Sequence, residues 1–120
     1  MSHYDTNLDK NSANFVPLTP LTFLMRAKEI YPEYEAVIYE DRKYTWAQVY
    51  KRTIKFASAL NKIGIKKGDT VSFLAFNTPE IFEGHYSVPM SGAVLNTINI
   101  RLDAKTIAYI LEHSDAKVLV

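Results

Sequence analysis

The residues GHYSVPMSGAVLNTINIRL, Gly84–Leu102, contain the change of secondary structure that decides the fold. The stretch begins as the second half of an amphipathic helix and is interrupted by the small residues Ser91–Ala93. It continues as a short apolar strand, Val94–Ile98, and Asp103 directly afterwards is a favourable cap for another helix. A helix that turns through glycine into an apolar strand is the second half of a β-α-β unit. We therefore predict an α/β fold, the beginning of a largely parallel, doubly wound sheet with flanking helices.

The preceding segment predicts the first half of the same unit. Thr70–Phe76 is a continuous apolar run, which is typical of a strand buried on both faces of a parallel sheet. Asn77–Glu80 then contains a capping residue, a proline for the first turn and an acidic residue that favours the helix dipole. Pro89 removes a backbone donor and is expected to kink this helix near Gly84–His85. The residues expected to face inward are Ile81, Phe82, His85, Tyr86 and Val88.

The clearest helix in the sequence begins at Thr45. Thr45 and Gln48 have the spacing of a capping box, in which each side chain bonds the free backbone N–H of the other residue. Gly64 is placed to end the helix in the left-handed conformation. The apolar residues at helical spacing between them are Trp46, Val49, Tyr50, Thr53, Ala57, Leu60 and Ile63.

The N-terminal part is predicted to be a polar arm followed by a helix and a hairpin. Residues 1–16 are rich in Asn, Asp and Ser, and we expect them to form the arm. Thr19 and Pro20 start a helix that reaches Tyr31, where the next residue is proline. Ala36–Glu40 is a strand candidate, residues 40–43 a polar turn, and residues 44–45 the start of a partner strand.

The C-terminal segment predicts one more helix and strand. The helix capped by Asp103 would present Ile107, Ala108, Ile110 and Leu111, and Lys117–Val120 would open the next strand. No segment follows this strand to cover it. We therefore expect an incomplete domain, the front part of a larger α/β protein.

Length and composition exclude several classes of protein. A chain of 120 residues forms at most one domain, and a net charge of +1 with scattered basic residues does not indicate a nucleic-acid partner. The absence of cysteine excludes disulfides, thiolate zinc sites and cysteine nucleophiles. No apolar run approaches the ~20 residues that span a bilayer, and no secretory signal is recognisable. The sequence predicts no transmembrane segment and a cytoplasmic location.

Few residues indicate a catalytic site. The four glycines fit neither a dinucleotide fingerprint nor a phosphate loop, and the sequence contains no Gly-x-Ser-x-Gly elbow. His3, His85 and His113 lack metal-ligand spacing. A packed core or interface role is favoured for His85 over that of a catalytic base, and His113 is placed to interact with a helix dipole.

Two other features leave alternatives open. Arg101, after the strand at Val94–Ile98, could pair with a carboxylate or with carbonyls of a later segment, or be a solvated loop residue. An aromatic set favours a core or interface role over a ligand cage. Its members are Tyr31, Tyr34, Tyr39, Tyr44, Trp46 and Tyr50.

Four segments, in consistent order over Pro17–Val120, resemble the AMP-forming acyl-CoA synthetases of the adenylate-forming ligase superfamily. DRKYTWAQVY, Asp41–Tyr50, resembles the family's signature of a short strand followed by an aromatic-Thr-aromatic start of a helix. IGIKKGDTVSFLAF, Ile63–Phe76, resembles its Gly-hydrophobic-x-x-Gly-Asp-x-Val segment. Gly84–Leu102 and Asp103–Val120 resemble the two segments that follow, most closely those of the medium- and long-chain fatty acid–CoA ligase branch.

The resemblance implies a two-step ligase. In the first step ATP and a carboxylate, with magnesium, would give an acyl-adenylate and pyrophosphate, and the thiol of coenzyme A would then displace AMP. The phosphate loop, magnesium-binding Glu, ribose-binding residues and C-terminal Lys of the family follow the part that resembles this sequence. Accordingly, residues 17–120 are interpreted as the N-terminal part of an AMP-binding domain, truncated before its catalytic motifs, and no catalytic, cofactor-binding or metal-binding residue is assigned.

The resemblance also implies partners. The chain alone is expected to be inactive and to bind no cofactor, and its partner would be the remainder of the ligase chain or a separate polypeptide that carries it. Residues 1–35 could form a homodimer contact. One alternative is a non-catalytic subunit-contact or partner-binding module derived from such a ligase, and another is an unrelated small doubly wound binding protein.

Overall fold

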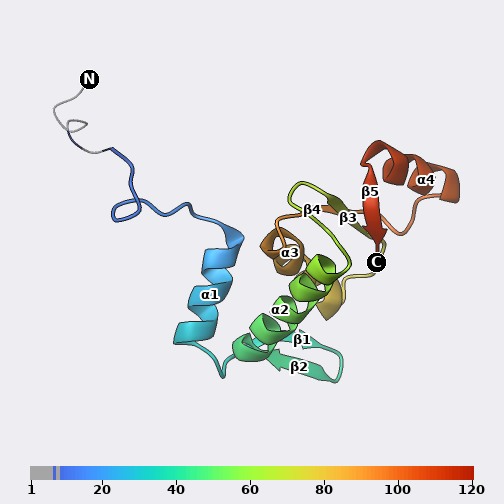
Figure 1. Cartoon of the computed structure of the whole chain (residues 1–120). Coiled ribbons are helices and arrows are strands. Elements are labelled where there is room, and N and C mark those ends of the chain that lie inside the picture. The colour runs from blue at the N-terminus through green and yellow to red at the C-terminus, as the bar shows by residue number, and fades with distance from the viewer. Residues whose placement is uncertain (1–6, 8) are drawn as a thin grey trace.

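The computed structural model describes Asn7 and residues 9–120, which form a mixed α/β fold (Figure 1). Each helix and strand expected from the sequence is present, although several begin or end at other residues. The elements are α1 (Pro20–Ile30), β1 (Glu35–Tyr39), β2 (Arg42–Thr45), α2 (Trp46–Lys62), β3 (Thr70–Phe73), α3 (Pro79–Met90), β4 (Val94–Thr97), α4 (Ala104–His113) and β5 (Ala116–Leu119).

The three C-terminal strands form a parallel sheet in the order β4-β3-β5. Thr70 of β3 lies opposite Val94 of β4 and Ala116 of β5. The chain therefore runs from β3 to β4 on one side, and from β4 it crosses β3 to reach β5 on the other side. Because parallel crossovers are right-handed, α3 and α4 lie on opposite faces of the sheet, as Figure 1 shows. The prediction of a parallel, doubly wound sheet is confirmed.

The main hydrophobic core lies on the face covered by α2 and α3. Leu60 of α2, Phe73 of β3 and Val88 of α3 are buried there together with Val71. Gly84 allows α3 to lie close to β3, since a Cβ atom at this position would be 2.9 Å from the Phe73 ring. The absence of a side chain at Gly84 therefore sets the distance between this helix and the sheet.

The opposite face carries a short polar network. The side-chain amide of Asn96 donates to Ser72 Oγ at 2.9 Å and to Ser114 Oγ at 3.2 Å. Ser114 is the C-cap of α4, so the network joins this helix to β3 and β4. No residue of α4 is fully buried, and the apolar residues Ile107, Ile110 and Leu111 are only half-buried. This face is therefore much less tightly packed than the first.

Strands β1 and β2 form an antiparallel hairpin that is separate from the parallel sheet. Tyr39 lies opposite Arg42, and the chain reverses through Glu40 and Asp41, with Glu40 at a φ of 50°. The predicted four-residue turn was too long, because Arg42 and Lys43 belong to β2. Because the backbone of Glu40 is in the left-handed conformation, the chain can reverse direction over only two residues, Glu40 and Asp41.

The predicted boundaries of α2 are confirmed. The Gln48 amide donates to Thr45 Oγ1 at 3.3 Å, and the Thr45 amide donates to Gln48 Oε1 at 2.9 Å. At the other end Gly64 has a φ of 94°, and the amide of Ile65 donates to the Leu60 carbonyl. Asp103 caps α4 as predicted, since its side chain accepts from the amides of Lys105 and Thr106.

Strand β3 is shorter than the predicted Thr70–Phe76. The last bonds to its neighbours are those from Ile98 to the Phe73 carbonyl and from Leu74 to the Val120 carbonyl. Beyond these bonds the chain turns toward α3, and Phe76 is 70% exposed. The apolar run therefore includes both the strand and the loop that follows it.

The predicted inward face of α3 was only partly right. The buried residues of α3 are Pro79, Glu83, Gly84, Ser87 and Val88. Of the predicted set, Val88 is buried and Ile81 packs half-buried against the core, whereas His85 is exposed. Small residues lie against β3 because they allow close approach, and Glu83 is buried because it pairs with Arg52. The helix runs to Met90 with Pro89 in its last turn, and a kink near Gly84–His85 stays a prediction.

Before α1, the described residues contain no helix or strand. Asn11 and Asn14 stabilise a turn, in which the amide of Ala13 donates to Asn11 Oδ1 at 2.9 Å. Residues 1–6 and 8 of the predicted arm lie outside the described residues, and so does His3, so the limits 1–16 stay a prediction. In the described part of the chain, no helix is long and apolar enough to cross a membrane.

Candidate functional site

The carboxyl ends of β3 and β4 form the position where an open α/β sheet binds ligands. From β3 the chain continues to α3 on one face, whereas from β4 it continues to α4 on the other. The two loops separate at this point and leave a crevice between them, which is the general ligand position in doubly wound sheets. A groove with a volume of about 520 Å³ lies here. We call it the strand-end groove.

The strand-end groove has an apolar part and four polar side chains. The polar side chains are those of Asn77, from the loop after β3, of Thr97, the last residue of β4, and of Asn99 and Arg101, from the loop after β4. The apolar part is formed by Ala75, Phe76, Ile81, Ile98 and Ile100. An apolar cleft with a few converging polar groups is typical of a small-molecule site.

The loop after β4 is held rigidly at its start. Ile98 is buried, and its amide donates to the Phe73 carbonyl at 2.8 Å. The side chain of Asn99 then accepts from the amide of Arg101 at 2.9 Å, and the Asn99 carbonyl accepts from the amide of Leu102 at 3.2 Å. These bonds fold residues 99–102 into a turn that sets the position of Arg101 at the groove.

Arg101 is the charged residue of the strand-end groove. Within the described residues the ion pairs involve Arg42, Lys43, Arg52 and Lys117, and none involves Arg101. Arg101 is exposed. Of its two predicted roles, the described residues agree with that of a solvated loop residue and show no pairing with a carboxylate. A guanidinium with its donors facing solvent can bind a carboxylate or a phosphate in a bidentate manner.

The strand-end groove does not fit a magnesium ion. No carboxylate lines it, whereas Mg²⁺ binds carboxylates together with phosphates and water. Across the part of the chain that the structure describes, no group of three His, Asp or Glu side chains could hold a metal ion.

A second groove lies between β1 and the first half of α3. It has a volume of about 640 Å³, and its lining includes Val37, Tyr39, Phe82, His85 and Tyr86. His85 Nδ1 lies 2.8 Å from the Ile81 carbonyl, and since a carbonyl can only accept, this nitrogen is the donor. His85 is not a core residue, because the helix turns its small residues toward the sheet and His85 toward solvent, and its predicted interface role stays a prediction.

A charged cluster joins the hairpin to α2 and α3. Arg42 bonds Glu80 at 2.6 Å, and Arg52 bonds the buried carboxylate of Glu83. Arg52 also lies 3.6 Å from Glu80 and over the ring of Tyr44. The hydrogen bond from Arg42 lowers the pKa of Glu80 to about 2, and the bond to Glu83 raises the pKa of Arg52. These charges are satisfied by one another, so the cluster is structural.

Sequence reasoning missed this cluster for a physical reason. Glu80 and Glu83 lie 38 and 31 residues beyond Arg42 and Arg52, respectively, so no local pattern connects the partners. A local signal existed only for Arg52, which directly precedes Thr53 in the stripe predicted for α2. None existed for Glu83, because the burial of Ser87, one helical turn away, was not predicted.

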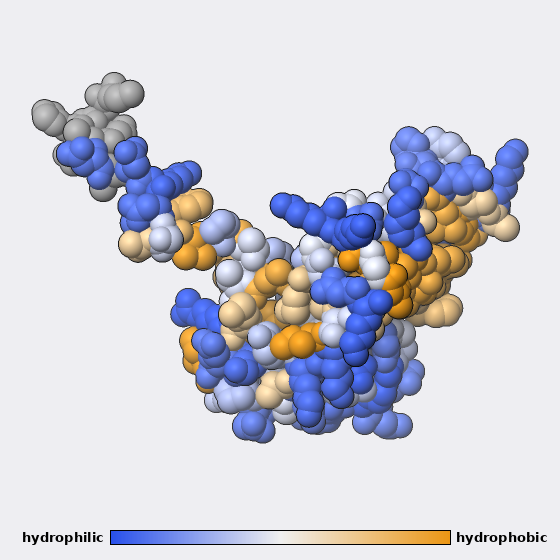
Figure 2. Space-filling model, viewed as in Figure 1, coloured by the Kyte–Doolittle hydropathy of each residue, from blue (hydrophilic) through white to orange (hydrophobic). Residues whose placement is uncertain are grey.

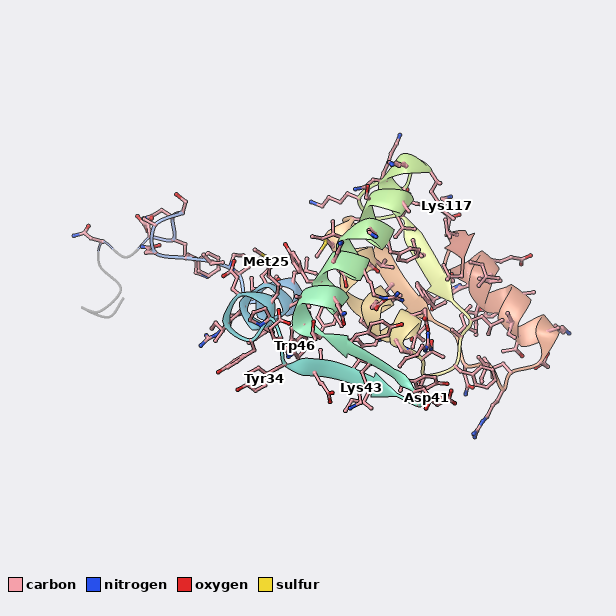
Figure 3. All side chains as sticks on the ribbon, turned by 90° about the horizontal axis from the view of Figure 1, so that it is seen from below. Met25, Tyr34, Asp41, Lys43, Trp46 and Lys117 are labelled. Carbon is pink, nitrogen blue, oxygen red and sulfur yellow. The ribbon has the colours of Figure 1, made fainter. Side chains whose placement is uncertain are left out.

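The aromatic set is more exposed than predicted. Tyr31 and Tyr34 are 51% and 69% exposed. Their rings meet edge to face, with 5.4 Å between the ring centroids. The other four members are half-buried. Tyr39 lines the groove beside α3, the ring of Tyr50 lies under the Lys28 ammonium of α1, and Figure 3 shows Trp46 at the start of α2. None is a core residue, so that part of the prediction was wrong, and the interface role stays a prediction. His113 lies in the last turn of α4, as predicted, and stacks on Tyr109.

Comparison with known proteins gives consistent results. The model of the family described as AMP-binding enzyme matches residues 24–120. A peroxisomal trans-cinnamate:CoA ligase from Petunia hybrida is 54% identical over 112 residues, which cover 93% of this chain and 20% of that protein. The peroxisomal butyrate–CoA ligase AAE11 from Arabidopsis thaliana is 53% identical over 113 residues, which cover 94% of this chain and 20% of that protein. The chain thus spans about a fifth of the length of these relatives.

A solved structure shares the fold. The O-succinylbenzoate coenzyme A synthetase from Bacillus subtilis, in complex with ATP and magnesium, matches with a TM-score of 0.76 and 28% identity. The match covers 81% of this chain and 27% of that one.

Proposed function

The chain belongs to the AMP-binding enzyme family, and we propose that it forms the N-terminal scaffold of an ATP-dependent acyl-CoA ligase. The observation that carries the proposal is the 54% identity to a trans-cinnamate:CoA ligase over 93% of this chain. The structural match to a coenzyme A synthetase, with 28% identity, supports the same reaction class. In this proposal the rest of the ligase supplies the chemistry, either on the same polypeptide or on a separate one.

The residues described here do not fit ATP and magnesium by themselves. The strand-end groove has one cationic side chain and no carboxylate, and no other group of described residues could hold the metal. We therefore derive no step of adenylate or thioester formation from this chain. Its role in the proposal is to hold Arg101 and the two asparagines at the carboxyl edge of the sheet, where they form one wall of a site for an anionic group of a substrate.

The substrate is proposed at two levels. At the coarser level it is a carboxylic acid that becomes a coenzyme A thioester. At the finer level we propose a medium- or long-chain fatty acid, from the resemblance of Gly84–Leu102 to that branch. The two relatives described above are named for trans-cinnamate and butyrate, so the finer level depends on a comparison of acids of different length and shape.

A chimeric ligase tests the proposal. Residues 17–120 of this chain replace the corresponding segment of the Arabidopsis butyrate–CoA ligase, and acyl-CoA formation is measured with butyrate, octanoate and cinnamate. We expect an active enzyme, because the scaffold is interchangeable if the fold and the strand-end groove are shared. A folded chimera without activity on any of the acids would overturn the proposal.

Two controls make the result specific. The isolated 120-residue chain should release no pyrophosphate from ATP in the presence of the acids, and release would contradict a scaffold role. In the chimera, Arg101→Ala should raise the KM for ATP or coenzyme A more than it lowers kcat, since Arg101 is proposed to bind and not to react. Lys105→Ala, in the first turn of α4, is the matched control and should leave both constants unchanged.

The alternative is a non-catalytic module that binds a subunit through its N-terminal region. Exposed apolar side chains support such a contact, including those of Phe23, Ile30 and Tyr31 around α1. Sedimentation of the chain with and without Phe23→Ser tests it. A homodimer that dissociates in the variant supports the contact, and a monomeric wild-type chain contradicts it.

Cytoplasmic location stays a prediction. The names of the two plant relatives describe them as peroxisomal. A fluorescent fusion of the complete protein, compared with a peroxisomal marker, separates the two locations.

A further inference from the structure

The charged residues of the chain are unevenly distributed. Residues 46–68, which form α2 and the turn after it, contain six of the fourteen Lys and Arg residues and no Asp or Glu. Residues 29–41, from the end of α1 to the turn of the hairpin, contain five Asp and Glu residues and no Lys or Arg. The net charge of +1 therefore conceals a basic segment and an acidic segment of similar size.

Five of the basic residues lie on the solvent side of α2 and on the turn that follows it. Lys51, Lys55 and Lys62 are four and seven residues apart, which places them on one line along the helix. Lys66 and Lys67 follow in the turn. All five are exposed, and among the described residues none of them belongs to an ion pair. We call these five residues the basic face.

Helix stability does not explain the basic face. A cation favours the helix dipole in the last turn, where Lys62 lies, whereas Lys51 and Lys55 lie further toward the start of α2. Like charges four residues apart destabilise a helix, and Lys51 and Lys55 have this spacing. Since lysine is almost never fully buried without a partner, a row of lysines marks a face that stays open to solvent when other segments pack on the molecule. The basic face therefore indicates an anionic partner.

The side chains beside the basic face favour a lipid surface. Ile54 is 41% exposed and Ile63 is 66% exposed, whereas the aromatic residues Trp46, Tyr50 and Phe56 of α2 are half-buried. Lysines together with exposed aliphatic side chains suit the headgroup region of an anionic bilayer, whereas single-stranded nucleic acids stack on exposed aromatic rings. Figure 1 shows α2 at the front of the molecule, and Figure 2 shows hydrophilic side chains over this front with hydrophobic ones among them.

We propose that the basic face binds the anionic surface of a lipid bilayer, with Ile54 and Ile63 at the headgroups beside the lysines. Clusters of about four to eight basic residues on an amphipathic helix are typical of such binding. The acidic residues favour one orientation, because the hairpin contacts the start of α2 and the same surface repels it. This inference goes beyond the proposed function and does not depend on the proposed reaction.

Vesicle binding of the 120-residue chain tests the proposal. Vesicles of phosphatidylcholine, with and without about 30% phosphatidylserine, are compared in 0.1 M and 0.5 M NaCl. We expect the chain to bind the anionic vesicles alone and to be released in 0.5 M NaCl, because salt screens the charges.

Two triple variants with the same net charge show whether the basic face is responsible. Lys51→Gln, Lys55→Gln and Lys62→Gln together should weaken binding about 100-fold, since each lysine near an anionic surface strengthens it about fivefold. The matched control changes three exposed lysines outside the basic face and should stay within about threefold of the unchanged chain. The control substitutions are Lys10→Gln, Lys105→Gln and Lys117→Gln.

The alternatives have distinct outcomes. No binding in 0.1 M NaCl, equal binding to both kinds of vesicle, or equal weakening in the two triple variants overturns the inference. A DNA duplex that displaces the chain from the vesicles at equal charge concentration would assign the basic face to a nucleic acid and overturn the proposed occupant.

The chimeric ligase described above carries the same variants, so the measurement does not require that the isolated chain folds. An active chimera that binds no anionic vesicles overturns the inference and leaves the proposed function intact. A folded, inactive chimera that binds them supports the inference and overturns the proposed function.

Discussion

The two faces of the parallel sheet are packed in different ways. On the face of α2 and α3, Leu60, Phe73 and Val88 are almost fully buried, and Gly84 allows the helix and the sheet to come into close contact. On the face of α4, the contact to the sheet includes the polar network of Asn96, and no helix residue is fully buried. The same strand, β3, therefore contributes an apolar core to one side and the hydroxyl of Ser72 to the other.

The difference shows which contacts this chain supplies for itself. Burial of large apolar side chains is the dominant favourable term in folding, and it is concentrated on one face here. The other face has hydrogen bonds whose net contribution is about 1 kcal/mol each. Stability should therefore depend strongly on the α2 and α3 face and weakly on the α4 face.

The largest difference is expected for truncation of core side chains. Phe73→Ala should lower the free energy of unfolding by about 3–5 kcal/mol, since it removes a buried ring and leaves a cavity. Ile110→Ala on α4, where the side chain is half-buried, should cost about 1 kcal/mol. Urea denaturation at 25 °C measures both.

If Phe73→Ala does not fold, Phe73→Leu provides the same comparison at smaller cost, because most of the volume is retained and the expected loss is about 1–1.5 kcal/mol. Equal losses for the Phe73 and Ile110 variants would contradict the unequal packing of the two faces.

The next effect concerns ion pairs. Arg52→Met leaves the carboxylate of Glu83, which has a side-chain exposure of 9%, without its partner. A buried charged group without a partner costs about 1–3 kcal/mol or more, so we expect a loss in this range. Lys117→Met breaks an exposed pair between Lys117 of β5 and the preceding Asp115, and we expect a much smaller loss because both side chains are solvated. Figure 3 shows that Lys117 lies at the opposite side of the molecule from the hairpin residues Asp41 and Lys43.

The Arg52 result has its own control. In the double variant Arg52→Met with Glu83→Gln, the charge of the orphaned group is removed, and part of the stability should return. A double variant less stable than Arg52→Met alone would show that burial of the charge is not the cause.

A smaller effect is expected where the helix meets the sheet. Gly84→Ala places a Cβ atom 2.9 Å from the Phe73 ring, and such overpacking costs about 1–3 kcal/mol. Alanine gains up to about 1 kcal/mol of helix propensity over glycine, so the net loss should be about 1 kcal/mol. The double variant Gly84→Ala with Phe73→Leu should lose less than the sum of the single variants, since the shorter side chain relieves the contact. Additive losses would place the cost elsewhere.

Much of the fold could be predicted from the sequence because its signals are local. The capping box at Thr45, the left-handed Gly64 and the cap at Asp103 each depend on residues within a few positions. The boundaries that were wrong depend on partners far along the chain. Strand β3 ends where β4 and β5 stop bonding to it, and Arg42 joins β2 because Tyr39 lies opposite.

The candidate site was less predictable for the same reason. Helical periodicity placed the large apolar residues of α3 inward, whereas the close approach of Phe73 selects Gly84 and Ser87 for that side. The turn of Asn99 and Arg101 is local, but its position at the groove depends on the order of the strands. The strand order is a property of the assembled sheet, and the sequence of a single β-α-β unit does not determine it.

The smallest effect is a pH dependence that also differs between the faces. Glu80, in the first turn of α3, has a pKa of about 2 in place of 4.5 because of the bond from Arg42. A carboxylate whose pKa is lower in the folded protein stabilises it fully above the ordinary pKa, and this contribution is lost as the pH falls from about 5 to about 2. On α4, the pKa of Asp103 is also lowered, mainly by the hydroxyl of Thr106. A bond from a guanidinium is stronger than one from a hydroxyl, so Glu80→Gln should reduce the loss of stability between pH 7 and pH 3 more than Asp103→Asn does. Asparagine remains a good helix cap, which makes the second variant a fair control.

The measurement is urea denaturation of the three proteins at both pH values, repeated in 0.5 M NaCl. Because Glu80 is half-exposed, salt should shrink its effect, and an effect that salt leaves unchanged would contradict an ion pair as its origin.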